Sequence, residues 1–311
     1  METSLLEIFL ARARQSPDWP ILDFEQRRWS AGALAHSVSV FAQGLSRRGL
    51  RPGERVALFL DNSPAFVIAY LGTWAAGGVV VLVNTQYRQV ELSHILADAE
   101  ARVCVTGADG AAELAPLRAA LPTLEWLVTV EPPRVPVPWP TLDFDTLLTG
   151  EAPAAAPPLP QGDQLAVLGY TSGTTGRSKG AMLLHRNLLA NVRAVTQAWR
   201  WTQADRLLLA LPLFHTHGLM VGLHGTLYSG GSVDLRRRFS APEVLDALHG
   251  DPSLTMFFGV PTMYGRLLEE ARRTGQRPRP LRLLVSGSAP LSPQLFHDVA
   301  ETFGQIGRAH V

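Results

Sequence analysis

The most informative segment of this 311-residue chain reads Tyr170-Thr-Ser-Gly-Thr-Thr-Gly-Arg-Ser-Lys-Gly180. Lys179 is the only lysine among the 28 Lys and Arg residues, and it stands in a loop of glycines and hydroxyl side chains. Glycines let a backbone approach an anion closely, amides and hydroxyls donate to anionic oxygens, and a compact ammonium neutralises phosphate charge. The segment therefore predicts a phosphate-binding loop. The alternative is that the single lysine stands here by chance, in a protein whose composition has drifted towards arginine.

A Walker A loop is excluded, because that motif needs a glycine, four residues and then Gly-Lys-Ser/Thr. The order here is Gly173-Thr-Thr-Gly176-Arg-Ser-Lys179-Gly180. The run instead resembles the signature phosphate loop of the adenylate-forming superfamily, which includes acyl-CoA synthetases, aryl-CoA ligases, luciferases and the adenylation domains of peptide synthetases.

Further segments resemble motifs of the same superfamily, in the same order and over nearly the whole chain. They are Gly72–Asn84, Glu91–Glu100, Leu211–Leu219 (Leu-Pro-Leu-Phe-His-Thr-His-Gly-Leu), Gly259–Met263 (Gly-Val-Pro-Thr-Met) and Ser286–Leu291 (Ser-Gly-Ser-Ala-Pro-Leu). Within the superfamily, the His-Thr-His-Gly and Ser-Gly-Ser-Ala versions look closest to acyl-CoA synthetases, including the malonyl-CoA synthetase branch.

Composition agrees with a globular enzyme core of more than one folding unit, since 46% of the residues are hydrophobic. The net charge of +1 and the dispersed arginines give no reason to expect nucleic-acid binding. Cys104 is the only cysteine, which excludes an internal disulfide and fits a reducing cytoplasm. The N-terminus does not look like a signal peptide, so a cytoplasmic location is expected.

One uncharged stretch, Ala65–Val83, is nineteen residues long and approaches the length of a membrane span. Gly77-Gly78 divides it into a helical piece and a β-branched run. We therefore expect a buried helix, a turn and a buried strand in place of a transmembrane segment.

Short apolar runs alternate with amphipathic segments, which predicts an α/β fold with helix-covered, mainly parallel sheets. The expected strands are 55–60, 79–83, 102–106, 126–130, 164–169, 206–211, 254–258 and 281–286, and the expected helices are 31–48, 64–76, 90–99 and 186–199. Ser63-Pro64 and Ser292-Pro293 have the pattern of helix starts, and Ser240-Ala-Pro-Glu243 has the spacing of a capping box.

Residues 132–160 hold nine of the 23 prolines and are expected to form an irregular connection. The resulting prediction is a first α/β subdomain at 1–131, a proline-rich connection at 132–163 and a second α/β subdomain at 164–305. Residues 306–311 are expected to be an atypical tail. A surface excursion within one domain is the alternative reading of the connection.

The resemblance implies site residues for ATP and for a carboxylic acid. The β- and γ-phosphates would be held by Thr171, Ser172, Gly173, Thr174, Thr175, Gly176 and Lys179. The adenine would lie against Gly287, Ser288, Ala289 and Pro290. The acyl pocket would include His215, His217, Gly218, Leu219, Gly259, Pro261, Thr262 and Met263. His215 would lie at the acyl–adenylate junction and donate a hydrogen bond there, so His215 and Lys179 are the expected catalytic residues.

Other readings of these residues remain open. His215 and His217 could belong to a zinc site, with His224 the nearest further ligand, or could be ordinary core or surface histidines. Met263 could be plain core. Residues 287–290, taken without the resemblance, are only a strand-to-helix turn.

The expected function is that of an ATP-dependent acyl-CoA synthetase, which converts a fatty acid or other carboxylic acid to acyl-AMP and then to acyl-CoA. ATP, Mg²⁺ and coenzyme A would take part. The superfamily continues with a Tyr-Gly-x-Thr-Glu motif whose glutamate helps to hold Mg²⁺, a ribose-binding aspartate and a small domain with a second lysine. None of these follows here, so no metal ligand is expected in this chain, and we expect a truncated form that does not complete the reaction.

The alternatives are a malonyl-CoA or other dicarboxylate ligase, an aryl-CoA ligase, an amino-acid-activating enzyme and, from another class, a non-catalytic nucleotide-binding fragment. No motif fixes the length of the acid or the oligomeric state.

Overall fold

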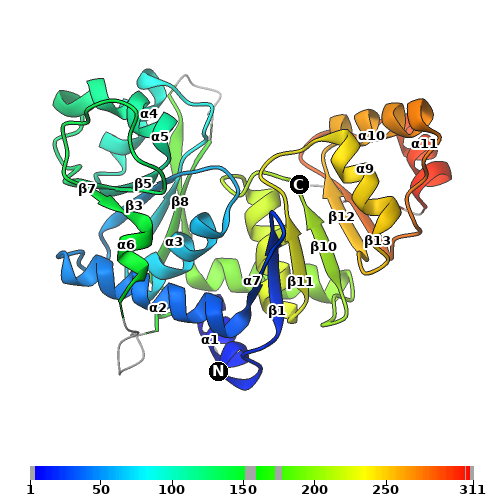
Figure 1. Cartoon of the computed structure of the whole chain (residues 1–311), viewed down its shortest axis with the longest axis horizontal. Helices are drawn as coiled ribbons and strands as arrows, with labels where there is room; N and C mark the ends of the chain where they lie inside the picture. The colour runs from blue at the N-terminus through cyan, green and yellow to red at the C-terminus, as the bar shows by residue number, and fades with distance from the viewer. Residues whose placement is uncertain (1–3, 151–158, 172–176, 305, 309–311) are drawn as a thin grey trace. The chain divides into compact units, whose positions relative to one another are not determined.

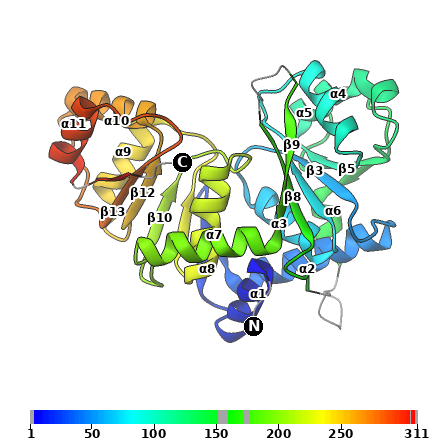
Figure 2. The ribbon, with the colours of Figure 1, turned by 180° about the vertical axis from the view of Figure 1, so that it is seen from behind.

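Two seven-stranded sheets with covering helices make up an α/β fold, shown from opposite sides in Figures 1 and 2. The computed structural model describes residues 4–150, 159–171, 177–304 and 306–308. The expected fold class, with helix-covered and mainly parallel sheets, is confirmed. The chain divides into two compact units, residues 1–19 with 30–190 and residues 20–29 with 191–311.

The sheet of the first unit has the strand order β7-β6-β5-β3-β4-β8-β9. Its neighbouring strands pair in parallel, except that β8 and β9 are antiparallel. The strands are β3 (Arg55–Phe59), β4 (Val79–Leu82), β5 (Ala101–Thr106), β6 (Trp126–Thr129), β7 (Thr141–Asp143), β8 (Leu165–Thr171) and β9 (Lys179–Leu184).

Helices cover this sheet. They are α1 (Leu5–Gln15), α2 (Ala31–Arg47), α3 (Pro64–Ala75), α4 (Gln89–Asp98), α5 (Ala108–Leu114), the 3-10 helix η1 (Ala115–Ala120), α6 (Phe144–Leu148) and the start of α7 (His185–Ala198). The expected start of α3 is confirmed, because the Ser63 hydroxyl accepts a hydrogen bond from the Phe66 amide at 3.2 Å.

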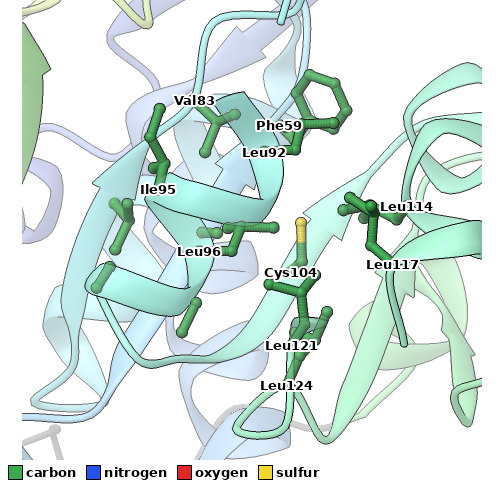
Figure 3. Close-up of a cluster of buried hydrophobic side chains, with 14 of the residues drawn as sticks. Phe59, Val83, Leu92, Ile95, Leu96, Cys104, Leu114, Leu117, Leu121 and Leu124 are labelled. Atoms are coloured by element: carbon green, nitrogen blue, oxygen red, sulfur yellow. The ribbon is translucent and has the colours of Figure 1, made fainter. Parts of the chain in front are cut away.

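The helix α4 packs on one face of this sheet through a cluster of buried apolar side chains (Figure 3). Leu92, Ile95 and Leu96 of α4 are at most 1% exposed and face the same cluster as Cys104 of β5 and Leu121. Each such side chain removed from water stabilises the fold by about 1.5–3 kcal/mol. The cluster therefore holds α4 firmly against the sheet.

The uncharged stretch 65–83 forms the buried helix α3, a turn and the strand β4, as expected. Thr73 donates to the carbonyl of Ala69 within α3, and the Trp74 indole donates to the carbonyl of Ala166 in β8. Among the residues that the structure describes, no helix has the length and apolar character needed to cross a membrane.

The sheet of the second unit has the order β14-β13-β12-β10-β11-β1-β2, and parallel pairing joins β14 through β1. Its strands are β1 (Pro20–Phe24), β2 (Arg27–Ser30), β10 (Arg206–Leu209), β11 (Ser232–Leu235), β12 (Met256–Gly259), β13 (Leu283–Ser286) and β14 (Ile306–Arg308). Its helices are the π-helix η2 (His217–Leu223), α8 (His224–Ser229), α9 (Ala241–Gly250), α10 (Pro261–Thr274) and α11 (Pro293–Phe303). Figure 1 shows α9, α10 and α11 gathered beside β12 and β13.

Two of the expected helix starts differ in how they are capped. The Ser292 hydroxyl accepts a hydrogen bond from the Leu295 amide at 3.2 Å, which confirms the start of α11. The helix α9 begins at Ala241, as expected. The Ser240 side chain makes no capping hydrogen bond, so the predicted capping box is not formed.

The structure corrects two expectations about irregular segments. The proline-rich connection contains β7 and α6, because prolines flank these short elements and do not interrupt them. Residues 306–308, expected to be an atypical tail, form β14, which pairs in parallel with β13.

The division into compact units also differs from the expected subdomains. The strands β8 and β9 belong to the first unit, because β8 pairs with β4 and β9 pairs with β8. The division therefore falls within α7, between Ala190 and Asn191, and not in the proline-rich connection.

A pH dependence of stability follows from His185, the buried first residue of α7. Its ring meets the Trp74 ring edge-on at 4.9 Å, and burial lowers its pKa from 6.5 to about 4. Between these values the unfolded chain binds more protons than the folded chain, so stability is lost as the pH falls from about 6.5 to about 4. His185→Phe is expected to remove about 2 kcal/mol of the stability difference between pH 7 and pH 5.

Urea denaturation of both proteins at the two pH values measures this difference. An identical acid sensitivity in the wild type and in His185→Phe would show that His185 does not titrate as proposed.

Candidate functional site

The hairpin of β8 and β9 carries both ends of the glycine-rich loop. Thr171 is the last residue of β8, Lys179 is the first residue of β9, and the antiparallel register places them directly opposite each other. Both residues are exposed. The other predicted phosphate ligands, Ser172, Gly173, Thr174, Thr175 and Gly176, lie outside the described residues. A hydroxyl and an ammonium therefore stand at the same end of one hairpin.

Two side chains of α4 contact the same hairpin. The Tyr170 hydroxyl donates to the Asp98 carboxylate at 2.6 Å, and the His94 imidazole donates through Nε2 to the Ser178 carbonyl at 2.8 Å. Burial, together with the Asp98 carboxylate, raises the pKa of Tyr170, so its hydroxyl keeps its proton at neutral pH. Sequence reasoning missed this contact between α4 and the loop.

In the second unit, the apolar strand β10 leads into the His-x-His pair. The segment turns after Pro212, whose carbonyl accepts a hydrogen bond from the His215 amide at 3.2 Å, and η2 starts at His217. A Cβ atom on Gly218 would lie 2.4 Å from the Pro212 carbonyl oxygen, so only glycine fits there. Short π-helical stretches of this kind are frequent at functional sites.

His217 is buried. Its Nδ1 lies 3.2 Å from the Ser288 hydroxyl, and its ring stacks on Phe258 at 6.3 Å. Burial lowers the pKa of His217 to about 4, so the ring is neutral at pH 7. Its Nε2 is buried without a hydrogen-bond partner among the described residues. A buried polar atom of this kind is normally satisfied, and a bound ligand would satisfy it.

His215 differs from His217, because its side chain is exposed and its ring meets that of Phe214 at 4.6 Å. Partial desolvation still lowers the pKa of His215. His224, the nearest further histidine, is buried in α8. Within the described ranges, no three His, Cys, Asp or Glu side chains gather where they could hold a metal ion. The zinc reading therefore has no support, and the Mg²⁺ implied by the resemblance is assigned no residue.

The segments Gly259–Met263 and Ser286–Pro290 meet at the carboxyl ends of the parallel strands β12 and β13. Gly259 and Ser286 are register partners, and the Gly287 amide donates to the Gly259 carbonyl at 3.3 Å. Ligands of open α/β sheets bind at this edge. The structure therefore brings together His217 and Gly259, which were expected in the acyl pocket, and Ser288, which was expected at the adenine.

The remaining predicted residues of this unit lie in the same two segments or in η2. Gly218, Leu219, Pro261 and Met263 are buried, whereas Thr262, Ala289 and Pro290 are exposed. Ser288 adopts a φ of 65°, a left-handed conformation that is uncommon for a residue with a side chain.

The Ser286 hydroxyl is also buried without a hydrogen-bond partner among the described residues, and sequence reasoning did not single it out. Like Nε2 of His217, it is available to a ligand.

Comparison with known proteins agrees with this arrangement. Residues 9–310 match the family described as AMP-binding enzyme. The chain is 35% identical to the sulfoacetate–CoA ligase of Cupriavidus necator over 307 residues, which are 97% of this chain and 58% of that protein. It is also 35% identical to a feruloyl-CoA synthase of Amycolatopsis over 91% of this chain and 54% of that protein.

A solved structure shares the fold. ATP-bound MatB from Rhodopseudomonas palustris superimposes with a TM-score of 0.82 at 32% identity, over 99% of this chain and 60% of that one. The chain thus spans a little more than half the length of these relatives.

Proposed function

Since the chain belongs to the AMP-binding enzyme family, we propose that it serves the ATP-dependent activation of a carboxylic acid and its transfer to coenzyme A. The observation that carries this proposal is the pairing of Thr171 with Lys179 at the end of the β8–β9 hairpin. Both side chains are exposed there and can meet phosphate oxygens. The similarity to an ATP-bound structure supports ATP as the nucleotide.

The reaction proceeds in two displacements. An oxygen of the acid carboxylate attacks the α-phosphorus of ATP, the bond to the pyrophosphate oxygen breaks, and acyl-AMP forms. The coenzyme A sulfur then attacks the acyl carbon and loses its proton, the bond from that carbon to the AMP oxygen breaks, and a thioester forms. Catalysis of this kind depends on positioning and on stabilising charge that moves between oxygens.

The described residues take the following proposed roles. Thr171 and Lys179 hold the β- and γ-phosphates, together with residues 172–176. His215 donates a hydrogen bond to a carboxylate or phosphate oxygen, and a neutral imidazole can do so through its one N–H. Residues 287–290 contact the adenine. His217 and the segment Gly259–Met263 border the acid.

The acid itself can be proposed from the relatives and from the charge of His217. The sequence predicted a fatty acid or other carboxylic acid, with a dicarboxylate or an aryl acid as alternatives, and the two named relatives are a sulfoacetate–CoA ligase and a feruloyl-CoA synthase. A neutral His217 offers a hydrogen bond and no positive charge. We therefore include acids with a neutral polar or aromatic portion, beside dicarboxylates, among the proposed substrates, and we propose a cytoplasmic location.

Acid-dependent exchange of labelled pyrophosphate into ATP tests the first displacement. In a protein that carries this chain together with the Tyr-Gly-x-Thr-Glu motif and the small lysine-bearing domain, we expect exchange with at least one member of a panel of a long-chain fatty acid, ferulate, malonate and sulfoacetate. The matched control is the same mixture without acid. ATP binding without exchange for any acid would contradict adenylation and would leave a non-catalytic nucleotide-binding module.

A further inference from the structure

The helix α4 presents two polar side chains to the β8–β9 hairpin from one of its faces. His94 and Asp98 are four residues apart, and residues at this spacing lie one above the other on a helix. His94 donates to the Ser178 carbonyl and Asp98 accepts from the Tyr170 hydroxyl. We call this pair of contacts the α4 clasp.

The clasp contacts the end of β8 and the residue just before β9, at positions next to the proposed phosphate ligands. Tyr170 precedes Thr171 on β8, and Ser178 directly precedes Lys179, the first residue of β9. The two contacts are thus one residue away from the hydroxyl and the ammonium that face the nucleotide. A shift of either strand end relative to α4 would move one of these groups.

The helix α4, which carries His94 and Asp98, is held in place by buried side chains. Leu92, Ile95 and Leu96 are buried in the cluster of Figure 3, which anchors the opposite face of the helix to the sheet. The Tyr170 ring packs against the same cluster and meets the His94 ring edge-on at 6.4 Å between centroids. The clasp therefore connects the strand ends to the core of the unit.

The hairpin needs this support on β9 more than on β8. The strand β9 is the last in its sheet, so its ladder of backbone hydrogen bonds runs to β8 alone. Gly180 leaves room for the Tyr170 ring, because a Cβ atom there would lie 3.1 Å from Cζ of Tyr170. The ring can thus lie across β9 and reach α4.

From these contacts we infer that His94 and Asp98 are positioning residues, which hold Thr171 and Lys179 at the spacing and orientation that bind the triphosphate of the nucleotide. The inference rests on the proposed function, since it assigns the clasp a role in ATP binding. His94 and Asp98 do not touch the nucleotide themselves; they act through Ser178 and Tyr170. The clasp thus affects only the part of ATP that contacts the hairpin.

The test compares ATP with AMP, which lacks the β- and γ-phosphates. Calorimetric titration of the whole chain gives the affinity of each nucleotide for the wild type, Tyr170→Phe and His94→Ala. Loss of one hydrogen bond of about average strength weakens ATP binding about 5-fold. The affinity for AMP is expected to stay within about 2-fold, since AMP makes no use of the hairpin. Asp98→Asn keeps an acceptor oxygen for Tyr170 and is expected to retain most of the ATP affinity.

Matched controls separate positioning from general stability. Tyr264→Phe removes a tyrosine hydroxyl that donates to the Val285 carbonyl within the second unit. His36→Ala removes an exposed histidine from α2 of the first unit. Both controls are expected to leave the ratio of ATP to AMP affinity unchanged.

The outcomes are distinct. Equal losses of ATP and AMP affinity in Tyr170→Phe, or no loss of either, overturn the clasp. Weaker ATP binding in Lys179→Ala with unchanged binding in Tyr170→Phe overturns the clasp alone and leaves the proposed function standing. Unchanged ATP binding in Lys179→Ala, or no ATP binding by the wild type, overturns the phosphate assignment and the clasp with it. Tyr170→Phe keeps the packed ring and removes only the hydroxyl. It therefore tests the clasp even if His94→Ala fails to fold.

Discussion

Lys179→Ala is expected to weaken ATP binding by about 10- to 100-fold. A hydrogen bond between charged partners is worth about 1.5–3 kcal/mol, and 1.4 kcal/mol corresponds to a factor of ten in affinity. Lys179 is exposed at the start of β9, opposite Thr171, so its removal leaves no cavity in the core and the fold is expected to persist. Calorimetric titration with ATP measures the change.

The matched variant is Lys179→Arg, which keeps the charge and changes only its shape. A guanidinium is a wide planar fork, whereas an ammonium is a point charge with rotatable donors. We expect this variant to lie between the wild type and Lys179→Ala. Equal affinities in all three proteins would refute the phosphate-binding role of Lys179.

Gly218→Ala is expected to destabilise the second unit by about 3 kcal/mol, at the upper end of the cost of overpacking. The added Cβ would lie 2.4 Å from the Pro212 carbonyl oxygen and 2.9 Å from that of Leu211. Both obstacles are backbone atoms at the turn between β10 and η2, so no side-chain rotation relieves the overlap. Urea denaturation measures the loss.

Gly265→Ala is the matched control, since it adds the same methyl group to the same unit. Gly265 lies inside α10, and a Cβ atom there would meet nothing within 4 Å. Alanine is favoured over glycine in a helix by about 0.5–1 kcal/mol, so this variant is expected to be stabilised. If Gly218→Ala were as stable as Gly265→Ala, the close approach of η2 to the Pro212 carbonyl would be contradicted.

The sequence predicted most elements whose signals are local. The apolar run that forms β3, the serine-and-proline start of α3 and the buried passage from α3 to β4 were all expected within one or two residues of their observed bounds. These elements depend on burial patterns and on caps formed by near neighbours in the chain. The capping box at Ser240 failed because the spacing alone does not ensure the hydrogen bond.

The hairpin of β1 and β2 was missed for a specific reason. Its two-residue loop is Glu25-Gln26, and both residues have positive φ, 45° and 67°. Tight hairpin loops of this kind usually carry Asn-Gly or Asp-Gly, which is the signal that sequence reasoning looks for. The sequence also gave no sign that this N-terminal hairpin joins β11 in the sheet of the second unit.

The candidate site likewise contains residues that the sequence predicted and residues that it did not. Lys179, His217 and Ser288 were predicted because they lie in contiguous motifs, whereas the clasp joins Asp98 to Tyr170 across 72 positions of the chain. Such a contact depends on how α4 and the hairpin pack, which no local pattern encodes. The unpaired hydroxyl of Ser286 was missed likewise, since its burial at the end of β13 becomes visible only in the folded chain.

The single lysine makes the hairpin chemically addressable. Because Lys179 carries the only ε-amine in the sequence and is exposed on β9, reductive methylation with ¹³C-formaldehyde adds one side-chain NMR reporter, beside that of the α-amino group. That reporter lies at the start of β9, opposite Thr171, where the proposed phosphates bind. Because every other basic side chain of the Lys and Arg type is an arginine, Lys179 is a single site at which a spectroscopic label can be attached.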